Sequence, residues 1–373
     1  MRGNTNRGIT RRVRAALSTA VAVCAVTAVL PAAASAEPAA VAGAASDSGA
    51  GVERISVATD GTQGDGDSAG ATITADGRRI AFSSSAQNLT SADPVTGERV
   101  FVRDRRTSRT VRMLTNTSPI ERPVISGDGQ YVALWGRLFR DTKTFLSQVS
   151  SESTIGINCP GLNCSQPSLS TDGRYIAQAA TFNRPATRQR VEVRDWHAGT
   201  AETVAEFEHT VSARPSISGD GRFVAYQDGQ AQDVLVWDRT DGTTSGPVEG
   251  PSKAAELVQL SKDGSKVVYL SGSDTYVHDM GSGTDLLVPG VRGVAIDPTG
   301  RYLLYAPHDT SGPSLLLRDL ATGTDETVSD RPASAGTDAV SAGGRDVVFH
   351  STADDIVPGD TNGTSDVFVR HYY

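Results

Sequence analysis

The sequence predicts an all-β fold, a single β-propeller of four-stranded blades, on two observations. A turn glycine recurs along the chain at intervals of 52, 44, 48, 43, 36 and 44 residues. The segments beside each turn alternate between apolar and polar residues, which is typical of half-buried strands. A period of this length with strand patterning indicates propeller blades rather than helical repeats. The turn glycines are Gly77, Gly129, Gly173, Gly221, Gly264, Gly300 and Gly344.

Each repeat is predicted to supply four strands. The first two flank the turn, as in residues 214–226, where Asp220-Gly221 separates two alternating segments. Asp-Gly in this setting is a strong hairpin signal, because glycine readily takes a positive φ. The third strand ends in an aspartate, and in four repeats a glycine four residues later predicts the turn into a fourth strand. Because these aspartates are periodic, we interpret them as structural rather than catalytic. They are Asp104, Asp141, Asp195, Asp238, Asp279 and Asp319.

The two ends of the repeat region complement each other. Residues 366–373 form a predicted third strand with no fourth strand after it, and residues 52–58 form a predicted strand with no partners of its own. Pairing the first strand with the last repeat would complete a four-stranded blade and close the ring, which removes exposed sheet edges. The prediction is therefore seven blades. Six is the alternative, because one interval is only 36 residues and its turn, Thr299-Gly300, is degenerate.

Residues 1–36 are predicted to be an export signal. Arg11-Arg12-Val13-Arg14 precedes an apolar run over residues 15–30, and Ala34-Ser35-Ala36 is a cleavage pattern. Residues 37–51 are rich in Ala, Gly, Ser and Pro and are predicted to be a flexible leader, so the propeller domain spans 52–373. We expect a secreted protein that uses the Sec route, with the twin-arginine route as the alternative. No later segment approaches 18 apolar residues, so no membrane span is expected after signal removal.

The net charge of the protein bears on which classes of partner it is expected to bind. The net charge of the 373-residue chain is −8, and removing residues 1–36 takes Lys plus Arg from 35 to 30 against 43 acids, which gives −13. Nucleic-acid binders normally have a basic excess, so no nucleic-acid partner is expected.

The cysteines agree with export. After signal removal only Cys159 and Cys164 remain, on either side of a Pro-Gly turn. In an oxidising compartment such a pair is expected to form a local disulfide. Two thiolates without further nearby ligands fall short of the four that a structural zinc site needs.

Two segments resemble a known family. Ile55-Ser-Val-Ala-Thr-Asp-Gly-Thr-Gln-Gly-Asp-Gly-Asp67 and residues 354–370 are similar to the TolB-type WD40-like propeller repeats of exported bacterial proteins. The resemblance covers about residues 52–373. It implies a propeller that serves as a partner-binding platform, a peptidase gate or part of a lyase. The chain lacks the additional α/β domain of TolB itself, and its seven repeats differ from the six blades of that protein.

Acidic residues of the first and seventh repeats are predicted to converge. In a propeller, the loops that join blades and the loops between second and third strands share one face, and these two repeats are neighbours in a closed ring. We call the predicted group the acidic sector: Asp60, Asp65, Asp67, Asp93, Asp354, Asp355 and Asp360.

A calcium site is one hypothesis for part of this region. Asp360, Asn362 and Asp366 place oxygen ligands at a spacing that partly resembles a Ca²⁺ loop, without the bidentate glutamate of an EF-hand. The alternative is ordinary Asx-turn chemistry at solvated loops.

Two functions remain compatible with the sequence. The first is a secreted, non-enzymatic propeller that holds a protein, peptide or glycan partner on its long-loop face. The second is an extracellular enzyme, a lyase or glycan hydrolase, with its site at the channel mouth. No Gly-x-Ser-x-Gly elbow, His-Glu-x-x-His motif, phosphate loop or dinucleotide fingerprint occurs. The sequence therefore favours the first function, assigns no catalytic residue, and predicts no cofactor apart from the calcium hypothesis.

Overall fold

The computed structural model describes residues 51–91, 96–115, 117–157, 159–183, 187–208, 214–228 and 231–372. These residues contain 28 strands and one short 3-10 helix, η1 (Ala342–Gly344), so the all-β class predicted from the sequence is confirmed. The predicted signal and all of the leader except Gly51 lie outside the described residues. Within the described part of the chain, no helix is long and apolar enough to cross a membrane.

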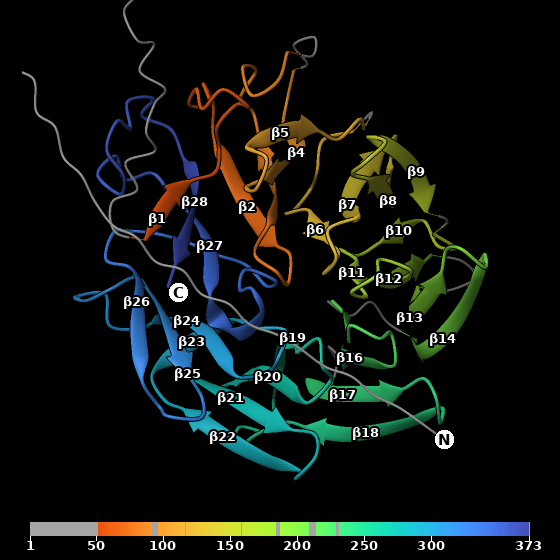
Figure 1. Ribbon diagram of the computed structural model, residues 1–373. Helices are drawn as coiled ribbons and strands as arrows, with labels where there is room; N and C mark the ends of the chain where they lie inside the picture. Colours follow the sequence, from red (N-terminus) through yellow and green to blue (C-terminus); the bar gives the residue numbers. More distant parts are fainter. Residues whose placement is uncertain are drawn as a thin grey trace, which may run out of the picture. The chain divides into compact units, whose positions relative to one another are not determined.

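Most strands belong to four-stranded antiparallel sheets whose strands pair in chain order (Figure 1). We number the strand sets as units along the chain. Unit one is β2 (Ser68–Ile73), β3 (Arg79–Ser84), β4 (Arg99–Asp104) and β5 (Arg109–Arg112). Unit four is β15 (Ser216–Ile217), β16 (Phe223–Asp228), β17 (Asp233–Asp238) and β18 (Thr243–Val248). Unit five is β19 (Glu256–Leu260), β20 (Lys266–Ser271), β21 (Asp274–Asp279) and β22 (Thr284–Val288). Unit six is β23 (Val291–Ile296), β24 (Tyr302–Pro307), β25 (Leu315–Asp319) and β26 (Asp325–Ser329).

Units two and three form one nine-stranded sheet, because the short strand β10 (Asn163–Cys164) pairs with both. Unit two is β6 (Val124–Ile125), β7 (Tyr131–Leu138), β8 (Asp141–Gln148) and β9 (Ser153–Ile157). Unit three is β11 (Ser168–Leu169), β12 (Tyr175–Phe182), β13 (Arg188–Asp195) and β14 (Thr200–Phe207).

Unit seven combines the two ends of the described chain. The strand β1 (Val52–Arg54) pairs antiparallel with β28 (Asp366–His371), which in turn pairs with β27 (Asp346–Ser351). An isolated bridge from Val340 to Val347 places a further extended segment on the other side of β27. The N-terminal strand therefore lies beside the last unit, as the sequence predicts.

Hydrogen bonds donated by backbone amides at the tight-turn end connect each unit to the next. Ala342 of unit seven donates to Ala75 of unit one over 2.9 Å, and Gly343 donates to the Asp297 carboxylate of unit six over 2.9 Å. The other links run from each unit to its successor: Ala75 to Gly127, Asp128 to Thr171, Thr171 to Gly219, Gly219 to Lys262, and Asp263 to Pro298.

The repeated turn serves both local folding and packing between units. In unit four, the Ser218 hydroxyl donates to Asp220 over 2.6 Å, and Gly221 follows with a φ of 76°. A Cβ on Gly221 would lie 2.3 Å from the Tyr175 ring of the preceding unit. The glycine is therefore needed twice, for its left-handed backbone and for the close approach of the neighbouring aromatic ring.

The periodic aspartates are structural, with one correction. Asp195, Asp238 and Asp319 end third strands, and each pairs with an arginine that follows the turn of its own unit, at 2.6, 2.6 and 2.7 Å respectively. The expectation for Asp141 was wrong, because this residue begins β8 rather than ending it. The β7–β8 hairpin is longer than the repeat pattern suggests, and the third strand of unit two runs on to Gln148.

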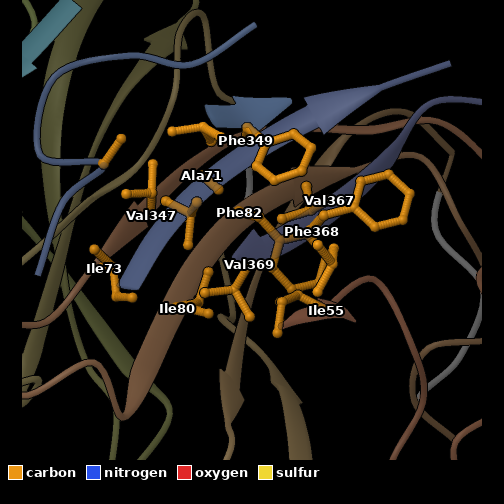
Figure 2. Close-up of a cluster of buried hydrophobic side chains, with 14 of the residues drawn as sticks. Ile55, Ala71, Ile73, Ile80, Phe82, Val347, Phe349, Val367, Phe368 and Val369 are labelled. Atoms are coloured by element: carbon orange, nitrogen blue, oxygen red, sulfur yellow. The ribbon is translucent and has the colours of Figure 1, made fainter. Parts of the chain in front are cut away.

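The largest buried apolar cluster joins the chain ends. Figure 2 shows Ile55 from the N-terminal segment beside Phe368 and Val369 of β28, with Phe82 of unit one in the same cluster. Phe349 and Phe368 stack with their ring centroids 5.6 Å apart. Since these residues are fully or almost fully buried, the cluster ties the terminal strands to units one and seven.

Candidate functional site

Asp360 of the acidic sector and the nearby Asp366 lie beside a cation of the protein itself. The Arg54 guanidinium is 3.3 Å from the Asp360 carboxylate and 3.6 Å from the Asp366 carboxylate. The Gln63 amide donates to both acids, at 2.7 and 2.8 Å. Asp366 is fully buried, and this burial raises its pKa, while hydrogen bonds from Ser56 and Gln63 oppose the rise. The pair of acids is therefore partly neutralised within the fold.

Asn362 lies in the same network. Its amide donates to the Gly64 carbonyl over 2.9 Å and to Asp366 over 3.2 Å. Within the described ranges, no group of three or more His, Cys, Asp and Glu side chains is placed to hold a metal ion. The calcium hypothesis for Asp360, Asn362 and Asp366 stays a prediction.

Four other members of the acidic sector have partners of their own. Asp65 accepts a hydrogen bond from the Gln87 amide over 2.6 Å, and Asp67 accepts one from Ser365 over 3.0 Å. Asp60 accepts a hydrogen bond from the Thr62 amide, and Asp355 forms an ion pair with Arg331. Asp354 is exposed. Asp93 lies outside the described residues.

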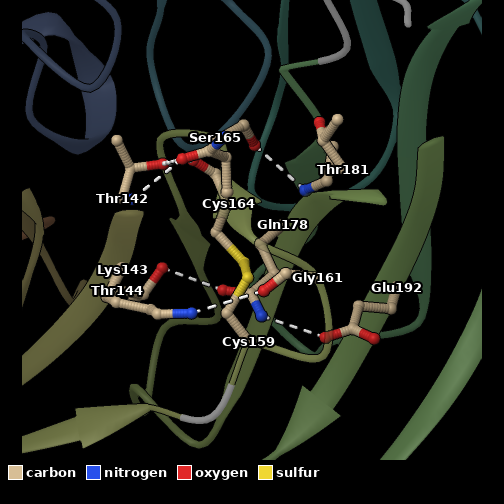
Figure 3. Close-up of a disulfide and its surroundings, with 12 residues drawn as sticks. Thr142, Lys143, Thr144, Cys159, Gly161, Cys164, Ser165, Gln178, Thr181 and Glu192 are labelled. Carbon is tan, nitrogen blue, oxygen red and sulfur yellow. Dashed lines mark hydrogen bonds between the residues drawn. A yellow bond between two sulfur atoms is a disulfide. The ribbon is translucent and has the colours of Figure 1, made fainter. Parts of the chain in front are cut away.

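The predicted disulfide is present between Cys159 and Cys164 (Figure 3). It closes the loop that leads into β10, and β10 lies between the two hairpins of units two and three. Thr142 of β8 donates to the Cys164 carbonyl over 2.9 Å, and the Leu162 amide donates to the Thr181 carbonyl of β12 over 2.9 Å. The loop thereby ties the β7–β8 hairpin to the β12–β13 hairpin. We call this assembly the hairpin platform: residues 136–145, 159–164, 181–183 and 187–190.

A buried polar chain lies under the hairpin platform. Thr144 donates to the Gln178 amide oxygen over 2.8 Å, and Gln178 donates to Glu192 over 2.9 Å. Arg194 and Arg190 approach the same carboxylate at 3.1 and 3.2 Å. Figure 3 shows this chain beside the disulfide. Because each buried member has a partner, the network holds the base of the platform in one arrangement.

A second group of polar side chains converges from several units. We call it the axial cluster: Arg122, Gln166, Gln259, Lys262, Thr337 and Asp338. Arg122 and Gln166 precede β6 and β11, Gln259 lies in β19, and Lys262 follows it. Thr337 and Asp338 lie in unit seven, just before the Val340 bridge to β27.

Contacts within the axial cluster connect units that are not neighbours along the chain. Asp338 of unit seven accepts from the Gln259 amide of unit five over 3.2 Å and pairs with Lys262 at 3.4 Å. Lys262 also donates to the Leu169 carbonyl of unit three over 2.9 Å. Arg122 of unit two donates to Thr337 of unit seven. Contacts that skip a unit must pass through the space that the units surround, so the cluster lies at their centre.

Asp338 and Arg122 are the unusual members. Asp338 has a φ of 58°, a left-handed conformation that few non-glycine residues adopt and that recurs at functional sites. Arg122 forms no ion pair with any described residue, and its buried Nε has no hydrogen-bond partner there. Burial lowers the pKa of Arg122, and the charges of Asp338 and Glu121 oppose that effect.

The nearby acids already have other cations. Glu121 pairs with Arg214 at 2.7 Å, and Asp338 pairs with Lys262. Arg122 therefore has hydrogen-bonding capacity that described carboxylates do not use.

Sequence reasoning missed the axial cluster. Its members are spread over more than 200 residues of sequence, and only the fold brings them together. A weak signal was available. Arg122, Gln166 and Arg214 occupy the same place in three consecutive repeats, each directly before a proline that leads into the first strand.

The histidines remain apart from this cluster where the structure describes them. His278 lies 3.0 Å from Asp285 on the outer strands of unit five, and His371 lies 2.9 Å from Asp346 in unit seven. Burial lowers the pKa of His350 in β27. His209 lies outside the described residues.

Comparison with known proteins shows the fold but no family. No family model and no curated protein matches the sequence. An oligogalacturonate lyase in complex with manganese matches with a TM-score of 0.64 at 12 % identity, over 88 % of this chain and 94 % of that one. An oligogalacturonate lyase from Vibrio parahaemolyticus matches with a TM-score of 0.63 at 11 % identity, over 87 % and 94 % of the two chains. TolB from Acinetobacter baumannii matches with a TM-score of 0.46 at 15 % identity, over 70 % and 62 %.

At these identities the lyases establish a β-propeller-like fold and nothing about activity. Membership in the TolB-type repeat family stays a prediction.

Proposed function

We propose that the protein is an exported, closed propeller of seven blades that binds an extracellular protein, peptide or glycan at its axial cluster. The pairing of β1 with β28 and the hydrogen bonds that link successive units support a closed ring of seven. The disulfide is consistent with an oxidising extracellular compartment. The TolB-type resemblance of the repeats agrees with a role in partner binding.

The observation that supports binding most strongly is the convergence of charged side chains on the centre. Arg122 offers a planar set of donors suited to a carboxylate or to paired hydroxyls. Gln166 and Gln259 offer amides, and Asp338 offers an acceptor for hydroxyl or ammonium groups. Residues of this kind, held by separate units of a rigid scaffold, orient a ligand that enters the centre.

A ligand screen tests this proposal. The mature chain, residues 37–373, would be applied to a glycan array and to a peptide library, and each hit repeated with Arg122→Gln. The control is Arg292→Gln, which removes an exposed arginine of unit six that pairs with Glu256 of unit five. We expect hits that weaken about tenfold or more in Arg122→Gln, since a charge-assisted hydrogen bond contributes about 1.5–3 kcal/mol. Hits that respond equally to both substitutions would contradict an axial site.

A lyase or glycan hydrolase is the second candidate. The two oligogalacturonate lyases share the fold, and Lys262 and Asp338 supply a cation and a carboxylate 3.4 Å apart at the centre. The axial cluster contains one carboxylate, two amides and two cations. Since this donor set does not fit a manganese ion, we derive no step through a metal.

The enzymatic candidate has its own assay. Oligogalacturonate and neutral oligosaccharides would be incubated with the protein, with and without Mn²⁺, and followed by reducing-end release and by the ultraviolet absorbance of an unsaturated product. Turnover that Asp338→Asn and Lys262→Met both abolish would support an enzyme. Absence of turnover, together with a confirmed ligand, would leave the binding function.

A further inference from the structure

We propose that the hairpin platform docks on an anionic lipid surface, through an apolar tip surrounded by cations. This inference goes beyond the axial binding function and does not depend on it. It rests on the conformation of one exposed aromatic residue, the anchoring of its hairpin, and the local charge.

The first observation is the strained and exposed conformation of Phe139. It occupies the β7–β8 turn with a φ of 57°, and 93 % of its surface is exposed. Both features are unfavourable in the isolated protein, because a left-handed backbone strains a bulky residue and water solvates the ring poorly. A glycine would relieve both costs, and a polar residue would relieve the second. An apolar partner that covers the ring would offset the second cost.

Two further apolar side chains lie beside this tip. Leu138 precedes Phe139 and is 43 % exposed, and Leu162 of the disulfide loop is 46 % exposed. Leu162 lies in the loop whose Gly161 carbonyl accepts from Lys143 of β8 over 3.3 Å. The hairpin is therefore held by β10 and the disulfide, so its tip is presented at low entropic cost.

The charge of the platform is opposite to that of the protein. Its described residues contain five cations and one acid, Asp141, whereas the whole chain has a net charge of −8. The cations are Arg137, Arg140, Lys143, Arg188 and Arg190, of which Arg190 is paired with Glu192 and Glu206 at the edge of the platform. The platform thus has a local positive charge that attracts an anionic surface, in a chain whose net charge is negative, and this attraction favours an approach with the platform foremost.

The arrangement fits a lipid interface because cations lie directly beside the apolar side chains of the hairpin tip. Phe139 and Arg140 form the turn, Leu138 pairs with Asp141 one step back, and Arg137 pairs with Thr142 behind it. Arg188 and Arg190 stack against the Phe182 ring, with the guanidinium carbons 4.8 and 5.2 Å from its centroid, at the start of β13. Inserted apolar groups with cations level with the lipid headgroups are the pattern of interfacial anchors.

Vesicle sedimentation tests the proposal. The probe is large vesicles of phosphatidylcholine alone or mixed with phosphatidylglycerol, and the protein is the mature chain, residues 37–373, which contains every described residue. We expect binding to the anionic vesicles that weakens with added salt, and little binding to the neutral ones. No binding to anionic vesicles would overturn the proposal.

Substitutions locate the contact. Phe139→Ser should weaken binding about tenfold or more, from the lost burial of one large apolar side chain. Arg137→Gln and Arg140→Gln should each weaken it about fivefold at low salt. The apolar control is Leu286→Ser with Leu287→Ser, two half-exposed residues of β22, and the charge control is Arg292→Gln. Equal losses in the test and control variants would overturn the assignment to the platform.

Two measurements complete the design. Phe139→Trp should show a blue-shifted emission with anionic vesicles only, and an unshifted emission would contradict insertion of the tip. An acidic polysaccharide in solution serves as the competing class of partner. If it binds the platform and anionic vesicles do not, the lipid assignment is wrong. Arg122→Gln should leave vesicle binding unchanged, which separates this proposal from the axial one.

Discussion

At the scale of single residues, the repeats are stabilised by an arginine after the turn and an aspartate at the end of the third strand. In unit six, Arg301 donates two hydrogen bonds to Asp319, at 3.1 and 2.7 Å. These bonds lower the pKa of Asp319 from 3.8 to about 2. The same pairing recurs as Arg174 with Asp195. Periodic acids that look like a catalytic set when isolated are thus explained by local ion pairs.

The Asp319 pair predicts a pH dependence. Because the pKa is lower in the folded state, the pair stabilises the fold above the ordinary value of 3.8, and this contribution is lost as the pH falls from there through about 2. Arg301→Gln should return the Asp319 pKa toward 3.8 and flatten that part of the stability curve. Carboxyl NMR titration and melting curves between pH 2 and 7 would measure both. An Asp319 pKa that does not change in Arg301→Gln would refute the assignment.

Calcium binding is a second prediction at this scale. If Asp360, Asn362 and Asp366 hold Ca²⁺, millimolar calcium should raise the melting temperature by mass action, and Asp360→Ala should abolish the shift. Arg54 and Gln63 already contact these acids, so the ion would have to displace them. Magnesium, which prefers smaller and more regular sites, should stabilise less. If a calorimetric titration with calcium shows no heat of binding, Arg54 rather than a metal ion balances the charge of these acids.

At the scale of elements, β1 is short but connects the two ends of the chain. It pairs with β28, and the Ile55 amide that follows it donates to the Val367 carbonyl over 2.8 Å. Ile55 is fully buried, and Arg54 faces two acids that would otherwise be uncompensated. Residues 52–55 therefore contribute strand pairing, core packing and charge compensation together.

Deletion of residues 51–58 should lower the melting temperature strongly or cause aggregation. Loss of a buried isoleucine alone costs about 2–5 kcal/mol, and the deletion also exposes the edge of β28. Scanning calorimetry and size-exclusion chromatography would measure the effect. Deletion of residues 37–50 is the control and should leave melting unchanged. A stable, monomeric variant without residues 51–58 would disprove the role of β1 in closing the fold.

The disulfide predicts a local rather than global effect. Unfolded, unreduced mature protein should contain no free thiol. Cys159→Ser with Cys164→Ser should change the melting temperature little, because a loop this short restricts few conformations of the unfolded chain. Hydrogen exchange should instead increase in residues 159–165, where β10 is held between β8 and β12. Two labelled thiols per chain without a reductant would exclude the bridge.

At the scale of the whole molecule, the proposed closed ring would make every unit depend on its neighbours. The hydrogen bonds from unit to unit return from Ala342 of unit seven to Ala75 of unit one. An open stack of repeats tolerates the loss of one repeat, whereas a closed ring does not, because the ring then has a gap or must change its curvature.

Removal of unit six, residues 291–329, tests this dependence. We expect an aggregated or poorly folded product with a broad melting transition, seen by circular dichroism and light scattering. A control that replaces the exposed residues 310–312 with Gly-Ser-Gly should melt like the parent protein. If the chain without unit six folds with undiminished cooperativity, the closed arrangement of seven is wrong.

The β-class, the spacing of the repeats, the partnership of the terminal strands and the Cys159–Cys164 pair could all be predicted from sequence patterns. Each of these depends on patterns within one repeat or on residues near one another, such as the alternation around Gly221 or the spacing of two cysteines. Turn chemistry and strand periodicity are local, so they can be read without the fold.

Only the tertiary structure placed Arg122 beside Thr337 and Asp338 beside Lys262, and only it paired Arg54 with Asp360 and Asp366. These contacts join residues from distant repeats, and no periodic signal specifies which side chains meet at the centre. The extension of the β7–β8 hairpin was likewise invisible, because strand patterning does not show where a hairpin ends when its tip is apolar. The exposure and backbone conformation of Phe139 follow from that extension and from the β10 bridge between two units.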